Sequence, residues 1–157
     1  MDIDWQLYVE NPPMATSAAL SDVESRLAVK IPDDLRTAFI QNQGLAPLSD
    51  VIDLPNGGQT AFGPLLFVGG TDQHPEYTYS VNFAIDALKE WAGQSDDTLL
   101  KLLPFGTNTG SGWFCLDYRT SLQHPSVVFV DTGYDMNEAG AITPVGSTFT
   151  DVLAKLH

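Results

Sequence analysis

The chain has 157 residues, with 20 Asp and Glu against 7 Lys and Arg and a formal net charge of −13. Such a charge repels phosphate backbones and anionic membranes, which argues against nucleic-acid and membrane binding. The length and the hydrophobic fraction of 43% predict a globular domain with its own core and exclude a disordered acidic tail.

The compartment is indicated by the cysteine count and by the start of the chain. Cys115 is the single cysteine, so no intrachain disulfide can form and a reducing compartment is favoured. Residues 1–5 lack the positive and apolar segments of a secretory signal. The longest apolar stretch, 65–68, is too short to cross a bilayer. We therefore expect a cytoplasmic protein.

The first 14 residues are expected to form a loosely tethered N-terminal arm ahead of one domain over 15–157. Asn11-Pro12-Pro13 ends regular structure there, because proline has no N–H to donate. Three apolar side chains of the arm can still attach it to the domain: Trp5, Leu7 and Tyr8.

Two short helices follow. Thr16 or Ser17 can cap the first, with a later start at a capping box, 21–24, as the alternative. The first helix must end before Pro32, because the residue before a proline avoids the α region. Pro32 fits the first position of the second helix, and Gly44 is a natural stop. The apolar residues recur at helical spacing in both: Leu20, Val23 and Leu27, then Leu35, Ala38 and Phe39.

The middle of the chain carries a turn, a strand and a third helix. Asn56-Gly57-Gly58 is a turn signal. Residues 61–68 predict a strand that is interrupted at Gly63-Pro64. The third helix is expected over 82–91, with Ile85, Leu88 and Trp91 on one side, and Gly93 ends it.

The C-terminal half is rich in strands. They are expected at 102–105, 113–118, 126–130 and 141–145, the third central and the last at an edge because of Pro144. A last helix begins at Ser147 or Thr148. The order predicts an α+β fold: a mixed or largely antiparallel sheet, with two N-terminal helices, a middle helix and a C-terminal helix packed on it.

Four segments together resemble a known family. They are the helix pair from Glu24 to Gly44 with Ile31-Pro32-Asp33-Asp34-Leu35 inside it, then Leu103-Pro104-Phe105-Gly106, then the Gly-rich turn and strand from Asn108 to Asp117, and last the strand from Val127 to Asp131 with the helix at Phe149. In order and spacing they are similar to the SUKH superfamily, which includes fungal cell-wall-assembly regulators and bacterial immunity proteins. The resemblance covers about 16–156.

The resemblance implies a non-enzymatic binding role. Bacterial relatives neutralise toxins, often nucleases, and the fungal relatives suggest the alternative of a regulatory scaffold or adaptor. A nuclease needs a cationic cleft to hold phosphates, and an acidic protein can occupy that cleft. The implied partner is a protein, a basic toxin domain in the first alternative. We expect the chain itself to be a monomer or a weak dimer.

Catalytic and metal sites are not indicated by the residues. The Gly-rich turn, 106–112, is followed by no Lys and by no helix, so it does not match a phosphate-binding loop. The three His and one Cys show no zinc spacing, and the acids near 131–138 do not match a calcium loop. We expect no cofactor, no metal and no enzymatic activity, although a hydrolase stays a third hypothesis.

The candidate partner site follows from where the charge lies. No Lys or Arg occurs between Arg36 and Lys89, or between Arg119 and Lys155. The acids of these two tracts are expected to dock the partner, with neighbouring tyrosines at the dry centre; solubility alone is the other interpretation of the charge. The site comprises Asp50, Asp53, Asp72, Glu76 and Tyr77, then Asp131, Tyr134, Asp135 and Glu138.

Overall fold

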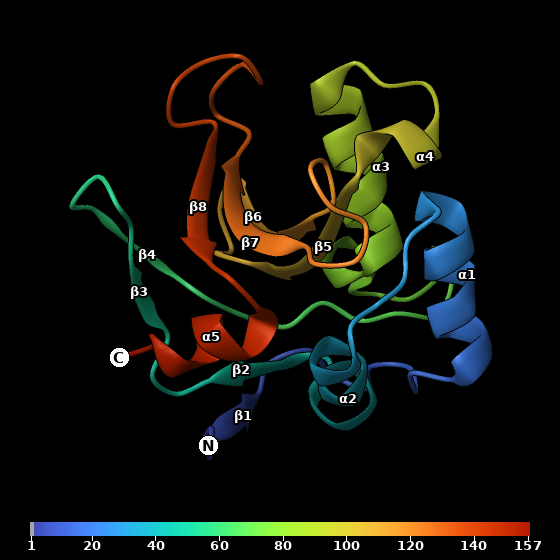
Figure 1. Cartoon of the computed structure of the whole chain (residues 1–157). Coiled ribbons are helices and arrows are strands. Elements are labelled where there is room, and N and C mark those ends of the chain that lie inside the picture. The colour runs from blue at the N-terminus through green and yellow to red at the C-terminus, as the bar shows by residue number, and fades with distance from the viewer. Residues whose placement is uncertain (1) are drawn as a thin grey trace.

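The computed structural model describes residues 2–157. They form five α-helices, a short 3-10 helix and eight strands, and every strand pair is antiparallel (Figure 1). The α+β fold expected from the sequence is confirmed. The strands make a four-stranded sheet and two two-stranded ribbons, so the sheet is more divided than the sequence indicated.

Helix α1, Ser17–Leu27, begins where its cap predicts. The side chain of Thr16 accepts a hydrogen bond from the N–H of Ala19 at 3.1 Å, which satisfies one of the free amides of the first turn. The capping-box start is not used. Leu20, Val23 and Leu27 are buried, as the spacing predicted.

Helix α2, Asp33–Asn42, buries the predicted stripe of Leu35, Ala38 and Phe39. Pro32 precedes the helix as its N-cap and is not the first helical residue, because its ψ of 152° is extended. Asp33 and Asp34 therefore occupy the first turn, where the helix dipole favours negative charge.

The N-terminal segment is attached more firmly than a loose arm. Strand β1, Trp5–Leu7, pairs with β2, Leu45–Pro47, directly after α2. Val9 is fully buried, and its N–H donates to the carbonyl oxygen of Gly44 at 2.9 Å. The expectation underrated this segment because β2 is only three residues long and carries no strand pattern of its own.

The turn at Asn56-Gly57-Gly58 joins β3, Val51–Asp53, to β4, Gln59–Ala61, as a hairpin. The strand expected over 61–68 is wrong, since regular pairing ends at Ala61. The buried run that follows forms only isolated bridges, at Leu65 and Phe67. Its amides still have partners: the N–H of Leu66 donates to the carbonyl oxygen of Phe105 at 2.8 Å, so the segment covers the edge of the main sheet.

The main sheet follows the predicted strands in chain order. It consists of β5, Leu102–Thr107, β6, Gly112–Asp117, β7, Ser126–Asp131, and β8, Ile142–Gly146. Strand β7 lies inside the sheet and β8 at its edge, as expected. At Gly112 an added Cβ would lie 2.3 Å from the ring of Phe129, so this position needs glycine.

Three further helices complete the fold. Helix α3, Val81–Ala92, follows the 3-10 helix η1, Tyr77–Tyr79, and ends at Gly93, whose φ is +67°. Helix α4, Asp97–Leu100, was not expected. Helix α5, Phe149–Ala154, is capped by Thr148. Helix α3 lies against β5, α5 against β8, α1 against α4, and α2 against α5.

Aromatic rings join these layers in one core. Phe114 of β6 lies 5.0 Å from Phe62, which follows the hairpin, and 5.0 Å from Phe129 of β7, between ring centroids. Phe105 of β5 meets Phe149 of α5 edge-on at 5.3 Å. Phe129 is in the core, whereas Trp91 is only partly buried.

Candidate functional site

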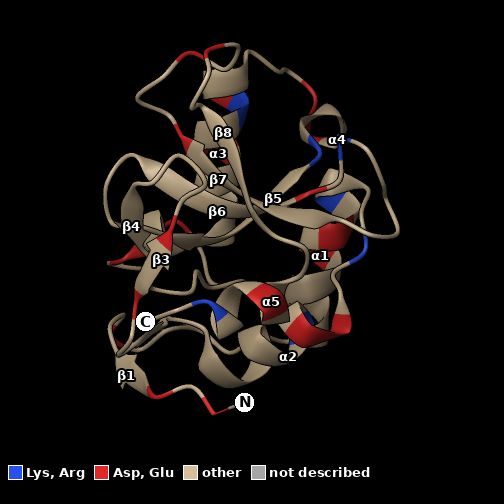
Figure 2. Cartoon of the chain, turned by 60° about the vertical axis from the view of Figure 1, so that its left-hand side comes forward, with Lys and Arg blue, Asp and Glu red and all other residues tan. Residues whose placement is uncertain are grey.

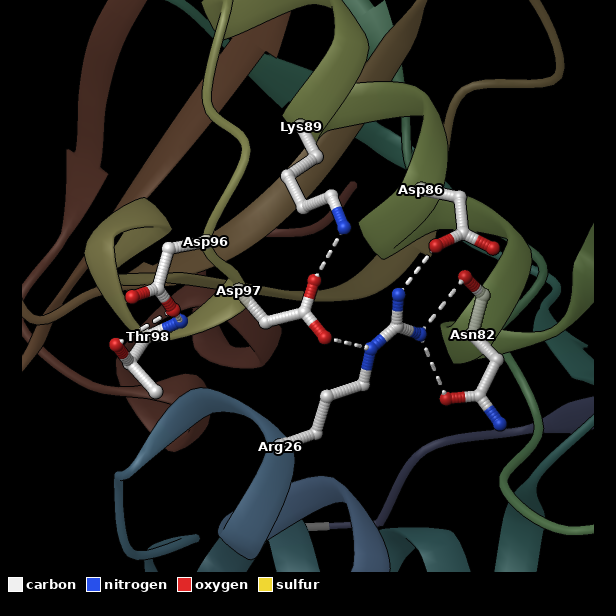
Figure 3. Close-up of polar contacts among 7 residues, drawn as sticks. All are labelled: Arg26, Asn82, Asp86, Lys89, Asp96, Asp97 and Thr98. Carbon is white, nitrogen blue, oxygen red and sulfur yellow. Dashed lines mark hydrogen bonds and ion pairs between the residues drawn. The ribbon is translucent and has the colours of Figure 1, made fainter.

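The few cations of the chain are largely engaged inside it. Arg26 of α1 donates from Nε to Asp97 Oδ2 at 2.8 Å, and its guanidinium also bonds Asp86 and Asn82 of α3 (Figure 3). Lys89 donates to the other oxygen of Asp97 at 2.6 Å. The hydrogen bonds from Arg26 and then Lys89 lower the pKa of Asp97. This cluster ties α1, α3 and α4 together.

Three more Lys and Arg pair within the chain. Arg36 lies 2.8 Å from Glu24, Arg119 lies 2.9 Å from Asp117, and Lys155 lies 3.3 Å from Asp151. Five acids thereby meet a Lys or Arg: Glu24, Asp86, Asp97, Asp117 and Asp151. Over residues 2–157, none of the seven acids expected to meet a partner pairs with Lys or Arg.

Two of these acids lie on the β3–β4 hairpin. Asp53 is exposed and accepts from Gln59 Nε2 at 2.7 Å, and it lies 3.1 Å from His157 Nε2. The bond from Gln59, and next that from His157, lowers the pKa of Asp53. Asp50 is partly exposed at the start of β3, beside the backbone pairing of Val51 with His157.

The end of β7 and the β7–β8 loop hold four more predicted site residues. Asp131 accepts from Ser111 Oγ at 2.8 Å and from the N–H of Gly133 at 2.9 Å, so it shapes the turn. Glu138 accepts from the N–H of Asp135 at 3.0 Å. Tyr134 is 44% exposed, and its carbonyl oxygen accepts from Trp91 Nε1 at 2.7 Å.

Hydrogen bonds across the β5–β6 turn join the hairpin to this loop. Asn108 Nδ2 donates to Thr60 of β4 at 3.2 Å, and Thr132 Oγ1 donates to the carbonyl oxygen of Ser111 at 2.7 Å. Six predicted residues lie on the two segments that the β5–β6 turn links in this way. These segments are here called the hairpin–loop surface, with Asp50, Asp53, Asp131, Tyr134, Asp135 and Glu138. Acidic positions recur over the hairpin and the loop in Figure 2.

The remaining three predicted residues lie elsewhere, beside the N-terminal segment. Glu76 accepts from the N–H of Glu10 at 2.7 Å, and Asp72 lies in the same 69–80 connection. Tyr77 is partly buried, with its ring edge-on to Phe83 at 6.1 Å. The structure thus does not bring Asp72, Glu76 and Tyr77 to the hairpin–loop surface.

A groove between α2, α5 and the first described residues of the chain was not predicted from the sequence. Its walls include Trp5, Ala38 and Leu153, with Asp2 and Asp33 at its rim. Sequence reasoning missed it because Ile3 and Trp5 were assigned to a loose arm. The signal was the alternation of acidic and large apolar residues in Asp2-Ile3-Asp4-Trp5.

Reactive and metal-binding groups are sparse in the part of the chain that the structure describes. No three His, Cys, Asp or Glu side chains there are grouped to hold a metal ion. Burial raises the pKa of the Cys115 thiol, which is fully buried in β6. Across residues 2–157, no helix combines the length and apolarity that crossing a bilayer demands.

A protein-family model matches most of the chain. The model of the SMI1 / KNR4 family (SUKH-1) matches residues 14–155, from just before α1 to just after α5. The chain belongs to the SMI1 / KNR4 family. A search of curated proteins gives no match. The expected SUKH resemblance is confirmed, and the matched range includes the whole hairpin–loop surface.

Proposed function

We propose that this SMI1 / KNR4 family protein is a non-enzymatic, cytoplasmic immunity protein, which neutralises a basic toxin domain through the hairpin–loop surface. The observation that carries the proposal is the division of the acids. Five Lys and Arg form ion pairs with other acids, whereas the acids of the hairpin and the β7–β8 loop are exposed or partly exposed and, within residues 2–157, form no ion pair with Lys or Arg.

Such a surface favours a cationic partner for physical reasons. Like charges that lie close together and lack internal partners produce a potential of one sign, which steers an oppositely charged domain into contact. The loop is also held in place before binding, because Trp91 and Ser111 bond its backbone and Asp131. A rigid surface loses less conformational entropy when it binds.

The regulatory adaptor is the second candidate, and the same surface could serve it. The two functions differ in the partner and not in the geometry. An immunity protein requires a toxin domain, and a secreted multidomain protein with a basic C-terminal domain, encoded beside this chain, would supply it.

The test is to co-express the chain with that basic domain and to measure cell survival and the association rate. We expect protection, and an association rate that falls steeply from low to high salt. A matched variant, Asp50→Asn with Asp135→Asn, should slow association, whereas Asp72→Asn should change it less. A rate that is independent of salt, or survival equal to that without the chain, would contradict the proposal.

A further inference from the structure

The groove beside α2 and α5 has an apolar floor. It has a volume of about 630 Å³, and its lining residues come from α2, α5 and the N-terminal residues. These elements lie in the lower part of the view in Figure 2. Ile3, Trp5 and Leu153 line it as partly buried side chains, and Ala38 and Phe149 of the core close it from below. Apolar area that stays open to water in a groove is suited to a partner's apolar side chain.

The rim of the groove is acidic. Asp2 and Asp33 are exposed, and within residues 2–157 neither carboxylate has a hydrogen-bond or ion-pair partner. No described residue that lines the groove is Lys or Arg. The rim is therefore complementary in charge to Lys or Arg side chains of a partner.

One acid of the groove has a different task. Asp34 Oδ2 accepts from the N–H and the Oγ1 of Thr150 at 3.0 and 2.9 Å, while Oδ1 accepts from the N–H of Leu35 at 2.8 Å. Asp34 thus holds the start of α2 against α5. The groove is preformed at this end, and docking would not have to create it.

The groove continues toward the hairpin–loop surface. A second hollow of about 310 Å³ shares Asp2, Ile3 and Leu153 with it and extends to Ser49 and Leu156. Ser49 and Leu156 directly precede Asp50 and His157, and His157 contacts Asp53. One partner can therefore span the hairpin acids and the groove.

We propose that this groove receives an amphipathic segment of a cationic protein partner. Apolar side chains of the segment pack between Trp5 and Leu153, and its Lys or Arg side chains meet Asp2 and Asp33. As a site for the toxin domain, the groove rests on the proposed function and supplies the dry centre of that interface, in place of Tyr77. A second copy of this chain, also with a charge of −13, would be repelled.

The first experiment uses a synthetic peptide of alternating Leu and Lys and follows the indole N–H signals of the three Trp by NMR. Trp5 lines the groove, Trp91 lies under the β7–β8 loop, and Trp113 lies in β6. We expect a saturable shift of the Trp5 signal that is larger than any shift of Trp91 or Trp113. A peptide with Glu in place of Lys should cause no shift.

Variants define the rim and the floor. The double variant Asp2→Asn with Asp33→Asn should weaken peptide binding about three- to tenfold, as two exposed ion pairs are lost. The matched control, Asp22→Asn with Asp72→Asn, removes two exposed acids outside the groove and the hairpin–loop surface and should change the Kd by less than about twofold. Leu153→Gln should weaken binding while its thermal unfolding verifies that the fold persists. A Trp5 signal that does not move, or binding that is insensitive to Asp2 and Asp33, would overturn the proposal.

A second experiment separates the groove from the proposed function. The proposed function requires a basic toxin domain encoded beside the chain, and that domain is titrated in place of the peptide. If it binds and shifts Trp5, the groove is part of the interface. If it binds without shifting Trp5, the groove proposal fails and the hairpin–loop surface stands. If it does not bind while the peptide still shifts Trp5, the proposed function fails and the groove remains a site for another cationic protein.

Discussion

Acidic side chains on two sides of this molecule differ in what they contact. Where α1, α3 and α4 meet, Asp86 and Asp97 bond Arg26 and Lys89 and hold helices together. On the hairpin–loop surface, Asp50 and Asp135 bond no Lys or Arg within residues 2–157. The acids where the three helices meet therefore support the fold through ion pairs, whereas Asp50 and Asp135 have no such partner among the described residues.

Replacing the central acid of the paired side should have the largest effect on stability. Asp97→Ala leaves Arg26 and Lys89 without their shared acceptor, at side-chain exposures of 22% and 25%. We expect the free energy of unfolding to fall by about 1–3 kcal/mol, measured as the urea midpoint. Asp135→Ala, on the hairpin–loop surface, should change the free energy of unfolding by less than about 0.5 kcal/mol. Equal losses of unfolding free energy in the two variants would contradict the difference between the two groups of acids.

Low pH should remove the interaction of Asp97 with Arg26 and Lys89 without a mutation. The pKa of Asp97 lies below its usual value of 3.8, because the folded state stabilises the carboxylate. Its contribution is fully present well above that value and is lost as the pH falls through the lower, folded-state pKa. The stability difference between the wild-type protein and Asp97→Ala should therefore shrink toward zero in strong acid, as followed by urea denaturation at several pH values. A constant difference would contradict this origin.

Loosening the β7–β8 loop should have a smaller effect. Trp91→Phe removes the donor to the carbonyl oxygen of Tyr134 and leaves an aromatic ring in place. We expect about 0.5–1.5 kcal/mol of lost stability. Backbone amides of residues 132–140 should exchange hydrogen faster, while those of α1 keep their rates. Unchanged exchange in the loop would show that Trp91 does not anchor it.

Neutralising acids of the hairpin–loop surface should have the smallest effect on stability, and it should stabilise the protein where the other variants destabilise it. Asp50→Asn with Asp135→Asn removes two charges that form no ion pair within residues 2–157, so self-repulsion decreases. The melting temperature should stay the same or rise slightly, and added salt should raise it less than in the wild-type protein. A clear destabilisation would mean that these acids support the fold.

Local rules predicted the elements whose signals lie within a few residues. The cap at Thr16, the stop at Gly93 and the edge position of Pro144 each depend on the backbone next to them. The failures depend on distant partners. Residues 62–68 form no regular strand, and backbone hydrogen bonds join several of them to the edge of β5. Strand β1 pairs with residues some forty positions later in the chain.

The site was predictable to the same limited extent. The sequence identifies the acids that lie in stretches of chain without Lys or Arg, because this depends only on the order of residues. It does not show that Asn108 reaches Thr60, which joins the hairpin to the turn beside Asp131, nor that Glu76 turns toward Glu10. Sharing a surface is a tertiary property, so Asp72 and Glu76 separate from the others only once the chain is folded.

The single cysteine can serve as a native probe of how often the sheet opens. Cys115 is enclosed in β6 and its thiol resists ionisation, so an alkylating reagent should reach it only when the sheet opens. The labelling rate in the native protein would then report how often the sheet opens, with no engineered probe. Protection of Cys115 on addition of a partner would reveal binding even before the partner's own activity is known.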